Sequence, residues 1–176
     1  MEELIGVVSC PRSGSSLTMQ TLKLLGVRVD APAFIPEHDG IRDYNKKGFY
    51  ELNLTEGIDD SYKGAVKLFG AQFAFTDKNI LNKIIYIHRN REDAIDSFLR
   101  FEPRAQEIYD ANDTLIRAEL KGVEHLKISY EDFLSDAHGT ILKIIAYLEI
   151  WPTLEKVRSA VDNVEQSYAN KNLIIK

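Results

Sequence analysis

Leu4-Ile-Gly-Val-Val-Ser-Cys-Pro-Arg-Ser-Gly-Ser-Ser16 is the stretch that decides the fold of this chain. Its first six residues are almost all apolar, which is typical of a strand buried on both faces of a parallel sheet. From Leu17 to Leu25 apolar residues recur at helical spacing, so a helix is predicted there. Ser15 or Ser16 can cap its start and Gly26 can close its end. The stretch therefore predicts a strand, a glycine-containing loop and a helix in succession.

The rest of the chain alternates between strand-like and helix-like segments. Further strands are predicted at residues 65–69, 83–88 and 124–129, with a short one at 28–30. Further helices are predicted at residues 53–62, after Asn90, and at 104–120, 140–148 and 153–164, while residues 165–176 carry no firm signal. This alternation predicts an α/β fold with a parallel sheet, in one domain spanning residues 1–176.

Composition excludes several classes of protein. The 176 residues carry a formal net charge of −5, which gives no reason to expect nucleic acid or an anionic membrane as the main partner. Cys10 is the only cysteine, so no internal disulfide is possible and a reducing, cytoplasmic compartment is expected. The acidic start lacks the basic region of a signal peptide, and every apolar run is far shorter than the ~20 residues of a membrane-spanning helix.

The loop between the first strand and the first helix has the chemistry of an anion site. Backbone N–H groups and the positive end of the helix converge there. Gly14 lets the backbone approach a phosphate closely, and Arg12 adds a forked cationic donor. The residues predicted to bind an anionic donor in this loop are Pro11, Arg12, Ser13, Gly14, Ser15 and Ser16.

The loop departs from the pattern of loops that bind ATP or GTP. Relative to G-x-x-x-x-G-K-[ST], Ser9 replaces the first glycine and Ser15 replaces the lysine. The clearest later strand ends at His88-Arg89, without the carboxylate that helps to hold Mg²⁺ in such enzymes. A nucleotide or small-molecule kinase is therefore the weaker enzymatic interpretation, and a tight serine-rich turn without function is the structural alternative.

A second anion-binding pattern follows the strand at residues 83–88. Arg89 lies just beyond the carboxyl end of this strand, and Ser97 lies on the helix that follows. In open α/β sheets ligands bind outside the carboxyl ends of the strands. Arg89 and Ser97 are therefore predicted to belong to the same site as the loop.

With these motifs the chain resembles the sulfotransferase family. Residues 11–16 resemble its 5′-phosphosulfate loop, and Arg89 with Ser97 resembles its 3′-phosphate clamp. The segment Asn45-Lys-Lys-Gly-Phe-Tyr-Glu51 is similar to a segment of small bacterial members, and Tyr130-Glu-Asp132 resembles another family segment. The resemblance implies a three-layer, P-loop NTPase-like architecture and 3′-phosphoadenosine 5′-phosphosulfate (PAPS) as the donor, with Tyr130 near the adenine. Adenosine 3′,5′-bisphosphate (PAP) would be the product.

The resemblance also implies a mechanism, with one departure. Lys67 matches the family's strand lysine, but Phe69 stands where cytosolic members have a catalytic histidine. Arg12 and Lys67 are expected to stabilise the charge on the transferred group without a metal ion. The candidates for the general base in the irregular segment are Glu51, which the Gly-Phe-Tyr-Glu match favours, Glu37 and His38.

The missing histidine leaves a non-catalytic PAP- or PAPS-binding protein as an alternative. The chain also lacks a counterpart of the C-terminal Arg-Lys-Gly segment of cytosolic members. The acceptor is expected to carry a hydroxyl or amine, but no stretch specifies which molecule it is.

Other residues that could carry chemistry have simpler interpretations. Cys10 is expected to pack as a small apolar group, because no histidine or basic neighbour supports a thiolate. His88, His125 and His138 have no metal-ligand spacing, so no metal site is predicted. Phe69, Phe73 and Phe75 alternate like core residues, with the lining of an acceptor pocket by one of them as the alternative.

Overall fold

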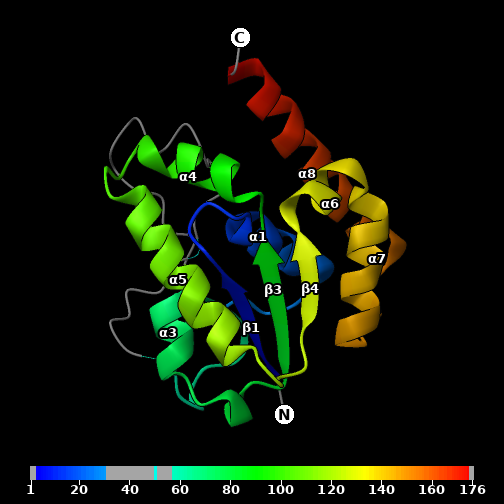
Figure 1. Ribbon diagram of the computed structural model, residues 1–176. Helices are drawn as coiled ribbons and strands as arrows, with labels where there is room; N and C mark the ends of the chain where they lie inside the picture. Colours follow the sequence, from blue (N-terminus) through cyan, green and yellow to red (C-terminus); the bar gives the residue numbers. More distant parts are fainter. Residues whose placement is uncertain (1–2, 31–49, 51–56, 175–176) are drawn as a thin grey trace.

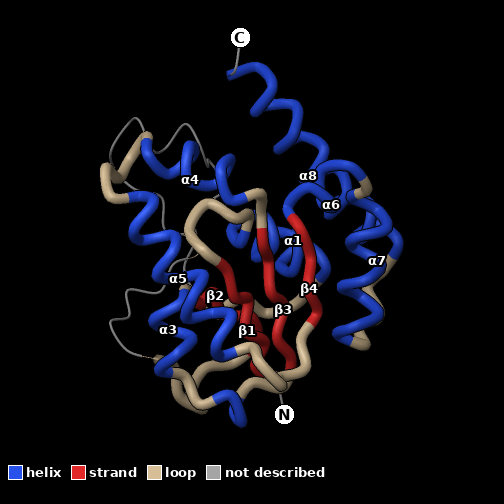
Figure 2. Tube along the Cα trace, in the orientation of Figure 1, coloured by secondary structure: helices blue, strands red, loops and turns tan. Residues whose placement is uncertain are grey.

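The computed structural model describes residues 3–30, 50 and 57–174, with side chains as far as residue 167. Its centre is a four-stranded sheet in the order β2-β1-β3-β4, with every neighbouring pair parallel (Figures 1 and 2). The strands are β1 (Leu4–Ser9), β2 (Gly64–Leu68), β3 (Lys83–His88) and β4 (Leu126–Ser129). The predicted parallel α/β sheet is therefore confirmed.

Helices cover both faces of the sheet, which makes the fold three layers thick (Figure 1). One face is covered by α1 (Ser15–Leu25), α6 (Tyr130–Ser135), α7 (Ala137–Leu148) and α8 (Leu154–Ile174). The other face is covered by α3 (Gly70–Phe75), α4 (Arg91–Leu99) and α5 (Ala105–Glu119), and the short 3₁₀ helix η1 (Lys78–Ile80) precedes β3.

The two cores explain why the strands are apolar throughout. In β1, Ile5 and Val7 pack into the core on the α1 side, whereas Leu4 and Val8 pack into the core on the α5 side. Successive side chains of a strand point to opposite faces, so a strand between two helical layers needs apolar residues at every position. Each buried valine or leucine stabilises the fold by about 1.5–3 kcal/mol.

The first helix begins one residue earlier than a serine cap would place it. The N-cap residue is Gly14, with φ of 97°, and no described side chain caps the helix. An L-residue other than glycine rarely adopts this conformation, so the backbone there depends on glycine. At the other end Gly26 closes the helix as predicted, and its N–H donates to the carbonyls of Leu22 and Lys23.

The prediction of a helix at residues 53–62 is wrong for the residues that the structure describes. Residues 57–62 form no helix, and residues 53–56 lie outside the described part of the chain. Gly57 packs against the backbone of Phe75 and Thr76, and the N–H of Ile58 donates to the Thr76 hydroxyl over 3.1 Å. These contacts hold residues 57 and 58 against the end of α3.

Three further expectations differ from the structure. Phe75 is not the core residue that the alternation predicts, because residues 70–75 form α3, in which Phe73 is buried and Phe75 is 73% exposed. Helix α8 continues to Ile174 through a segment without a sequence signal. The short strand predicted at residues 28–30 is a single bridge between Val29 and Ala65.

Candidate functional site

The site lies at the carboxyl edge of the sheet, where the chain turns from β1 into α1. The next strand in sequence, β2, lies on one side of β1, and β3 lies on the other. The strand order therefore reverses at β1, and such a switch point is where open α/β sheets bind ligands. The loop that follows β1 is thus in the position that the sequence predicts for an anion site.

The loop backbone is shaped to present N–H groups. Arg12 and Gly14 both have positive φ, 64° and 97°. Alternation of left-handed and right-handed residues turns successive N–H groups toward one concave side, which is how backbone binds anions. The described first turn of α1 contains no acidic residue, so the positive end of the helix is not neutralised from within that turn.

Arg12 connects the loop to α4. Its Nε donates a hydrogen bond of 3.2 Å to the Ser97 hydroxyl, across 85 residues of sequence. Its guanidinium carbon lies 5.0 Å from the centre of the Phe101 ring, a cation–π distance. Phe101 was not predicted from the sequence. It follows Ser97 by four residues, a spacing that places both side chains on one side of α4 and of the turn that follows it.

Arg89 contacts the same loop from the end of β3. Its Nη1 donates a hydrogen bond of 3.2 Å to the Arg12 carbonyl, and it forms no ion pair with a described carboxylate. Its guanidinium carbon lies 4.9 Å from the centre of the Tyr130 ring. Two guanidinium groups thus meet at one loop, an arrangement that favours an anion between them.

Tyr130 closes the site from the end of β4. It is the first residue of α6, where Ser129 accepts a hydrogen bond from the N–H of Asp132 and so caps the helix. The Tyr130 ring lies directly against Gly14. Burial raises the pKa of the Tyr130 phenol, and the charges of Arg89 and Arg12 oppose this shift.

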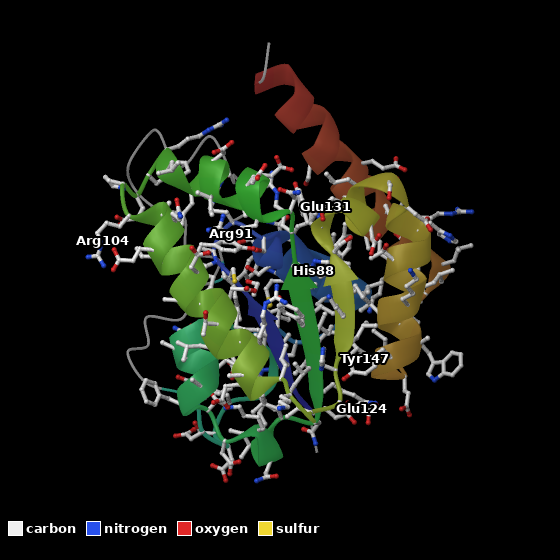
Figure 3. The ribbon with its side chains drawn as sticks, in the orientation of Figure 1. His88, Arg91, Arg104, Glu124, Glu131 and Tyr147 are labelled. Carbon is white, nitrogen blue, oxygen red and sulfur yellow. The ribbon has the colours of Figure 1, made fainter. Side chains whose placement is uncertain are left out.

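Side-chain contacts also join the two strand ends next to Tyr130. The N–H of Asn90 donates to the Glu131 carboxylate over 3.0 Å, and Figure 3 shows Glu131 above the ends of β3 and β4. Asn90 itself caps α4, as predicted, by accepting from the N–H of Asp93. These bonds fix where Arg89 leaves the sheet.

Lys67 reaches the site from β2. Its residue is 3% exposed, and its Nζ donates a hydrogen bond of 3.3 Å to the Ser16 hydroxyl. The ammonium also lies 4.9 Å from the centre of the Phe69 ring. A buried lysine at the phosphate loop supplies positive charge in a poorly solvated place, where electrostatic stabilisation is strongest.

Two buried polar atoms in the site have no partner among the described residues. They are the hydroxyl oxygen of Ser13 and Nε of Arg89. Buried polar atoms are usually hydrogen-bonded, so each such exception needs an explanation. Both atoms belong to residues that the sequence assigns to an anionic ligand. Tyr109 lies beside the Ser13 hydroxyl, so Nε of Arg89 is the atom whose missing partner a bound phosphate or sulfate would supply.

Cys10 has the structural role that the sequence predicts. Its residue is 2% exposed, and its thiol points to the carbonyl of Tyr109 at 4.0 Å. Burial, with a smaller contribution from the Asp113 charge, raises the pKa of Cys10 to about 12. A thiol with this pKa is not a nucleophile at neutral pH.

The structure brings most of the predicted site together. Pro11 to Ser16, Lys67, Arg89, Ser97 and Tyr130 all lie at this one edge of the sheet. The base candidates Glu37, His38 and Glu51 lie outside the described residues. Within residues 3–30 and 57–174 no three metal-ligating side chains are grouped to hold a metal ion.

Comparison with solved structures shows which fold this is. A mouse sulfotransferase in complex with PAP matches with a TM-score of 0.62 at 16% identity, over 96% of this chain and 66% of the mouse chain. Retinol dehydratase in complex with androsterone and PAP matches with a TM-score of 0.58, at the same identity and coverages. The sulfotransferase domain from the curacin biosynthetic pathway matches with a TM-score of 0.54 at 15% identity, over 89% of this chain and 77% of that domain.

These likenesses show that the chain has the sulfotransferase fold, an α/β architecture with a parallel sheet between helices. The chain spans 66% of the mouse sulfotransferase and of retinol dehydratase, slightly less than two thirds. By sequence, no family model and no curated protein matches it. In the part of the chain that the structure describes, no helix is long and apolar enough to cross a membrane.

Proposed function

We propose that this chain is a single-domain sulfotransferase that transfers the sulfuryl group of PAPS to an acceptor hydroxyl and releases PAP. The observation that carries the proposal is the meeting of Arg12, Arg89 and Ser97 at a phosphate loop that follows the switch-point strand. The fold is shared with sulfotransferases whose structures contain PAP.

The residues present fit such a donor. The loop N–H groups and Arg12 would hold the 5′-phosphosulfate, since they provide donors and positive charge at the start of α1. Arg89 and Ser97 would hold the 3′-phosphate, and Nε of Arg89, which is buried without a partner among the described residues, supports this assignment. Tyr130, whose ring packs against both Gly14 and Arg89, would lie beside the adenine.

The donor supplies an activated sulfur, and the protein supplies position and charge. In the transfer the acceptor oxygen forms a bond to sulfur, while the bond from sulfur to the bridging phosphate oxygen breaks. That oxygen keeps the electron pair and leaves as part of the 5′-phosphate. Lys67 and Arg12 would stabilise the charge that develops on the bridging oxygen and the sulfuryl oxygens. Such charge stabilisation contributes about 10²–10³-fold in rate for each well-placed donor.

The acceptor proton needs a base in this mechanism. Phe69, which contacts Lys67, has no group that accepts a proton. We assign the base to Glu51, with Glu37 and His38 as alternatives, on the sequence resemblance described above. A protein that binds PAP or PAPS without turnover is the second candidate, and the phenylalanine at residue 69 is the observation that favours it.

Calorimetric titration of the purified protein with PAP tests the donor site. Arg89→Ala and Ser97→Ala are expected to weaken PAP binding by at least about tenfold, because each removes a charged or hydroxyl donor from the phosphate. Arg91→Ala is the matched control: Arg91 is two residues away on α4 (Figure 3), and it pairs with Asp110 of α5. PAP affinity of the control should stay within about twofold.

The same titration distinguishes the alternatives. Clear binding of ATP with Mg²⁺ and none of PAP would overturn the proposal in favour of a kinase. Tight PAP binding without transfer of radioactive sulfate to any acceptor in a broad panel would favour the non-catalytic candidate.

A further inference from the structure

The segments that follow β3 and β4 stay side by side after the sheet ends. His88 and Ser129 are the last residues of the two strands, and they pair with each other. Arg89 and Tyr130 come next, and the guanidinium carbon of Arg89 lies 4.9 Å from the centre of the Tyr130 ring. The residues assigned to the 3′-phosphate and to the adenine of the donor thus follow directly from two neighbouring strand ends.

One residue further along, a carboxylate takes the place of a backbone acceptor. In a parallel ladder the N–H groups of one strand bond the carbonyls of its neighbour, but at this level β4 has already turned into α6. The N–H of Asn90 donates instead to the Glu131 carboxylate over 3.0 Å, and Glu131 lies above the ends of both strands (Figure 3). Hydrogen bonds to an ionised acceptor are stronger than bonds to a neutral one. Glu131 thus continues the connection between the two segments beyond the sheet.

Asn90, the residue held by this bond, lies between the two residues assigned to the 3′-phosphate. Arg89 precedes it, and α4, which carries Ser97, follows it. The Asn90 side chain caps α4 by accepting a hydrogen bond of 3.2 Å from the N–H of Asp93. A displacement of Asn90 would therefore move the end of β3 and the start of α4. Because Arg89 and Ser97 would contact one phosphate, their spacing depends on the position of Asn90.

The charge of Glu131 by itself opposes the binding of a phosphate at this place. Glu131 carries a negative charge one residue from Tyr130, and like charges repel. The carboxylate does not offset this cost by pairing with Arg89, which forms no ion pair with a described carboxylate. Removal of the charge alone would therefore strengthen phosphate binding, whereas removal of the bond to Asn90 would weaken it. The two effects of residue 131 have opposite signs and can be separated.

We propose that Glu131 is a positioning residue for the 3′-phosphate of the donor, and that it acts on Arg89 and Ser97 through the backbone of Asn90. The proposal rests on the proposed function, because it presupposes that Arg89 and Ser97 hold this phosphate. Glu131 contributes the oxygen that accepts the Asn90 N–H, and the gain from this bond exceeds the repulsion by its charge. The selectivity of the site for nucleotides with a 3′-phosphate therefore depends on a residue that does not contact the phosphate.

Calorimetric titration of the parent and two variants with PAP and with adenosine 5′-monophosphate (AMP) tests this role. The two nucleotides differ only in the 3′-phosphate. Glu131→Gln keeps an oxygen acceptor and removes the charge, whereas Glu131→Ala removes both. We expect Glu131→Ala to weaken PAP binding by about tenfold and AMP binding by less than about twofold. Glu131→Gln should bind PAP within about twofold of the parent, or more tightly, because the bond to Asn90 remains.

Glu92→Ala is the matched control, because Glu92 is also an exposed carboxylate and lies two residues from Asn90 in the first turn of α4. It should change PAP binding by less than about twofold. Hydrogen exchange at the Asn90 amide measures the bond itself without a nucleotide. Glu131→Ala should speed this exchange by at least about tenfold, and Glu131→Gln should change it much less.

Several outcomes would overturn the proposal. Tighter PAP binding by both Glu131 variants would show that residue 131 acts through its charge alone. Equal losses of PAP and AMP affinity in Glu131→Ala would show general damage to the site and no selective effect on the 3′-phosphate. Parental PAP affinity or unchanged Asn90 exchange in Glu131→Ala would overturn this inference alone. A parent protein that binds no PAP would overturn the proposed function, and this inference with it.

Discussion

The ring of Tyr130 occupies the space that a side chain at residue 14 would need: a Cβ on Gly14 would lie 2.5 Å from Cδ2 of Tyr130. The contact joins the loop after β1 to the start of α6 after β4. The phosphate loop is therefore closed by a residue from the far edge of the sheet, and its shape depends on glycine for two reasons. The backbone is left-handed there, and the ring leaves no room.

Gly14→Ala is expected to destabilise the protein by more than the strain of a left-handed alanine, which is about 1–2 kcal/mol. Gly122→Ala isolates that strain, since Gly122 also has positive φ, 80°, and nothing lies within 4 Å of its Cβ position. Urea unfolding compares the two variants. Equal losses of stability in the two variants would show that the clash with Tyr130 adds nothing to the destabilisation by Gly14→Ala. Only Gly14→Ala should also weaken PAP binding.

Lys67→Met should lower the rate of sulfate transfer by about 10²–10³-fold, because it removes a buried charge at the phosphate loop. Affinity for the donor PAPS should fall much less, since in PAPS the bridging oxygen has not yet gained the charge that it acquires as its bond to sulfur breaks. Lys63→Met is a control on the same segment, where Nζ bonds the Asp60 carbonyl. A parallel loss of affinity and rate in Lys67→Met would instead make Lys67 a ground-state binding residue.

The Cys10 thiol should resist alkylation in the folded protein. Its pKa is about 12 in the fold against an ordinary value of 9.0, so at pH 8 its thiolate fraction is lower by about a thousandfold. Burial of the sulfur slows the reaction further. Mass spectrometry after iodoacetamide treatment, with and without urea, measures this protection. Rapid alkylation of the native protein would contradict the burial of Cys10.

Stability should decline in alkaline solution. Burial raises the pKa of Cys10, Tyr86 and Tyr109 to about 12 from ordinary values of 9.0, 10.0 and 10.0. Between about pH 9 and 12 the unfolded chain therefore binds fewer protons than the fold, and the free energy of unfolding falls as pH rises. Urea midpoints between pH 8 and 11 measure this fall. Cys10→Ala should make it shallower, and an unchanged slope would exclude a contribution from Cys10.

Chelation should leave PAP binding and sulfate transfer within twofold of their untreated values. In the proposed mechanism Arg12, Lys67 and Arg89 would provide the positive charge that Mg²⁺ provides in kinases. Titration and transfer assays after dialysis against EDTA measure the effect. Loss of transfer that Mg²⁺ restores would show that these three side chains do not suffice.

The sequence predicted correctly those elements whose formation depends on residues close together in the chain. The bounds of β3 are those predicted, because a strand buried on both faces must be apolar throughout and Asn90 begins a helix soon after it. By contrast, Phe69, Phe73 and Phe75 alternate like core residues, but residues 70–75 form α3 and Phe75 is exposed. There the Gln72 side chain accepts the N–H of Phe69, and the N–H of Gly70 donates to Asn112 of α5, 42 residues away. A contact with a distant helix decided what the alternation could not.

The sequence by itself determined the parallel α/β fold and indicated the residues of the proposed donor site, because a strand, a glycine turn and a helix start are each encoded within a few neighbouring residues. The tertiary structure decided how those residues meet. Arg12 bonds Ser97 across 85 residues, and Gln20 bonds Asn163 across 143. The first contact exists because parallel strands bring their carboxyl ends to one edge, and the second because α8 packs antiparallel along α1. Helix packing of that kind depends on the shapes of two surfaces, which no short stretch of sequence contains.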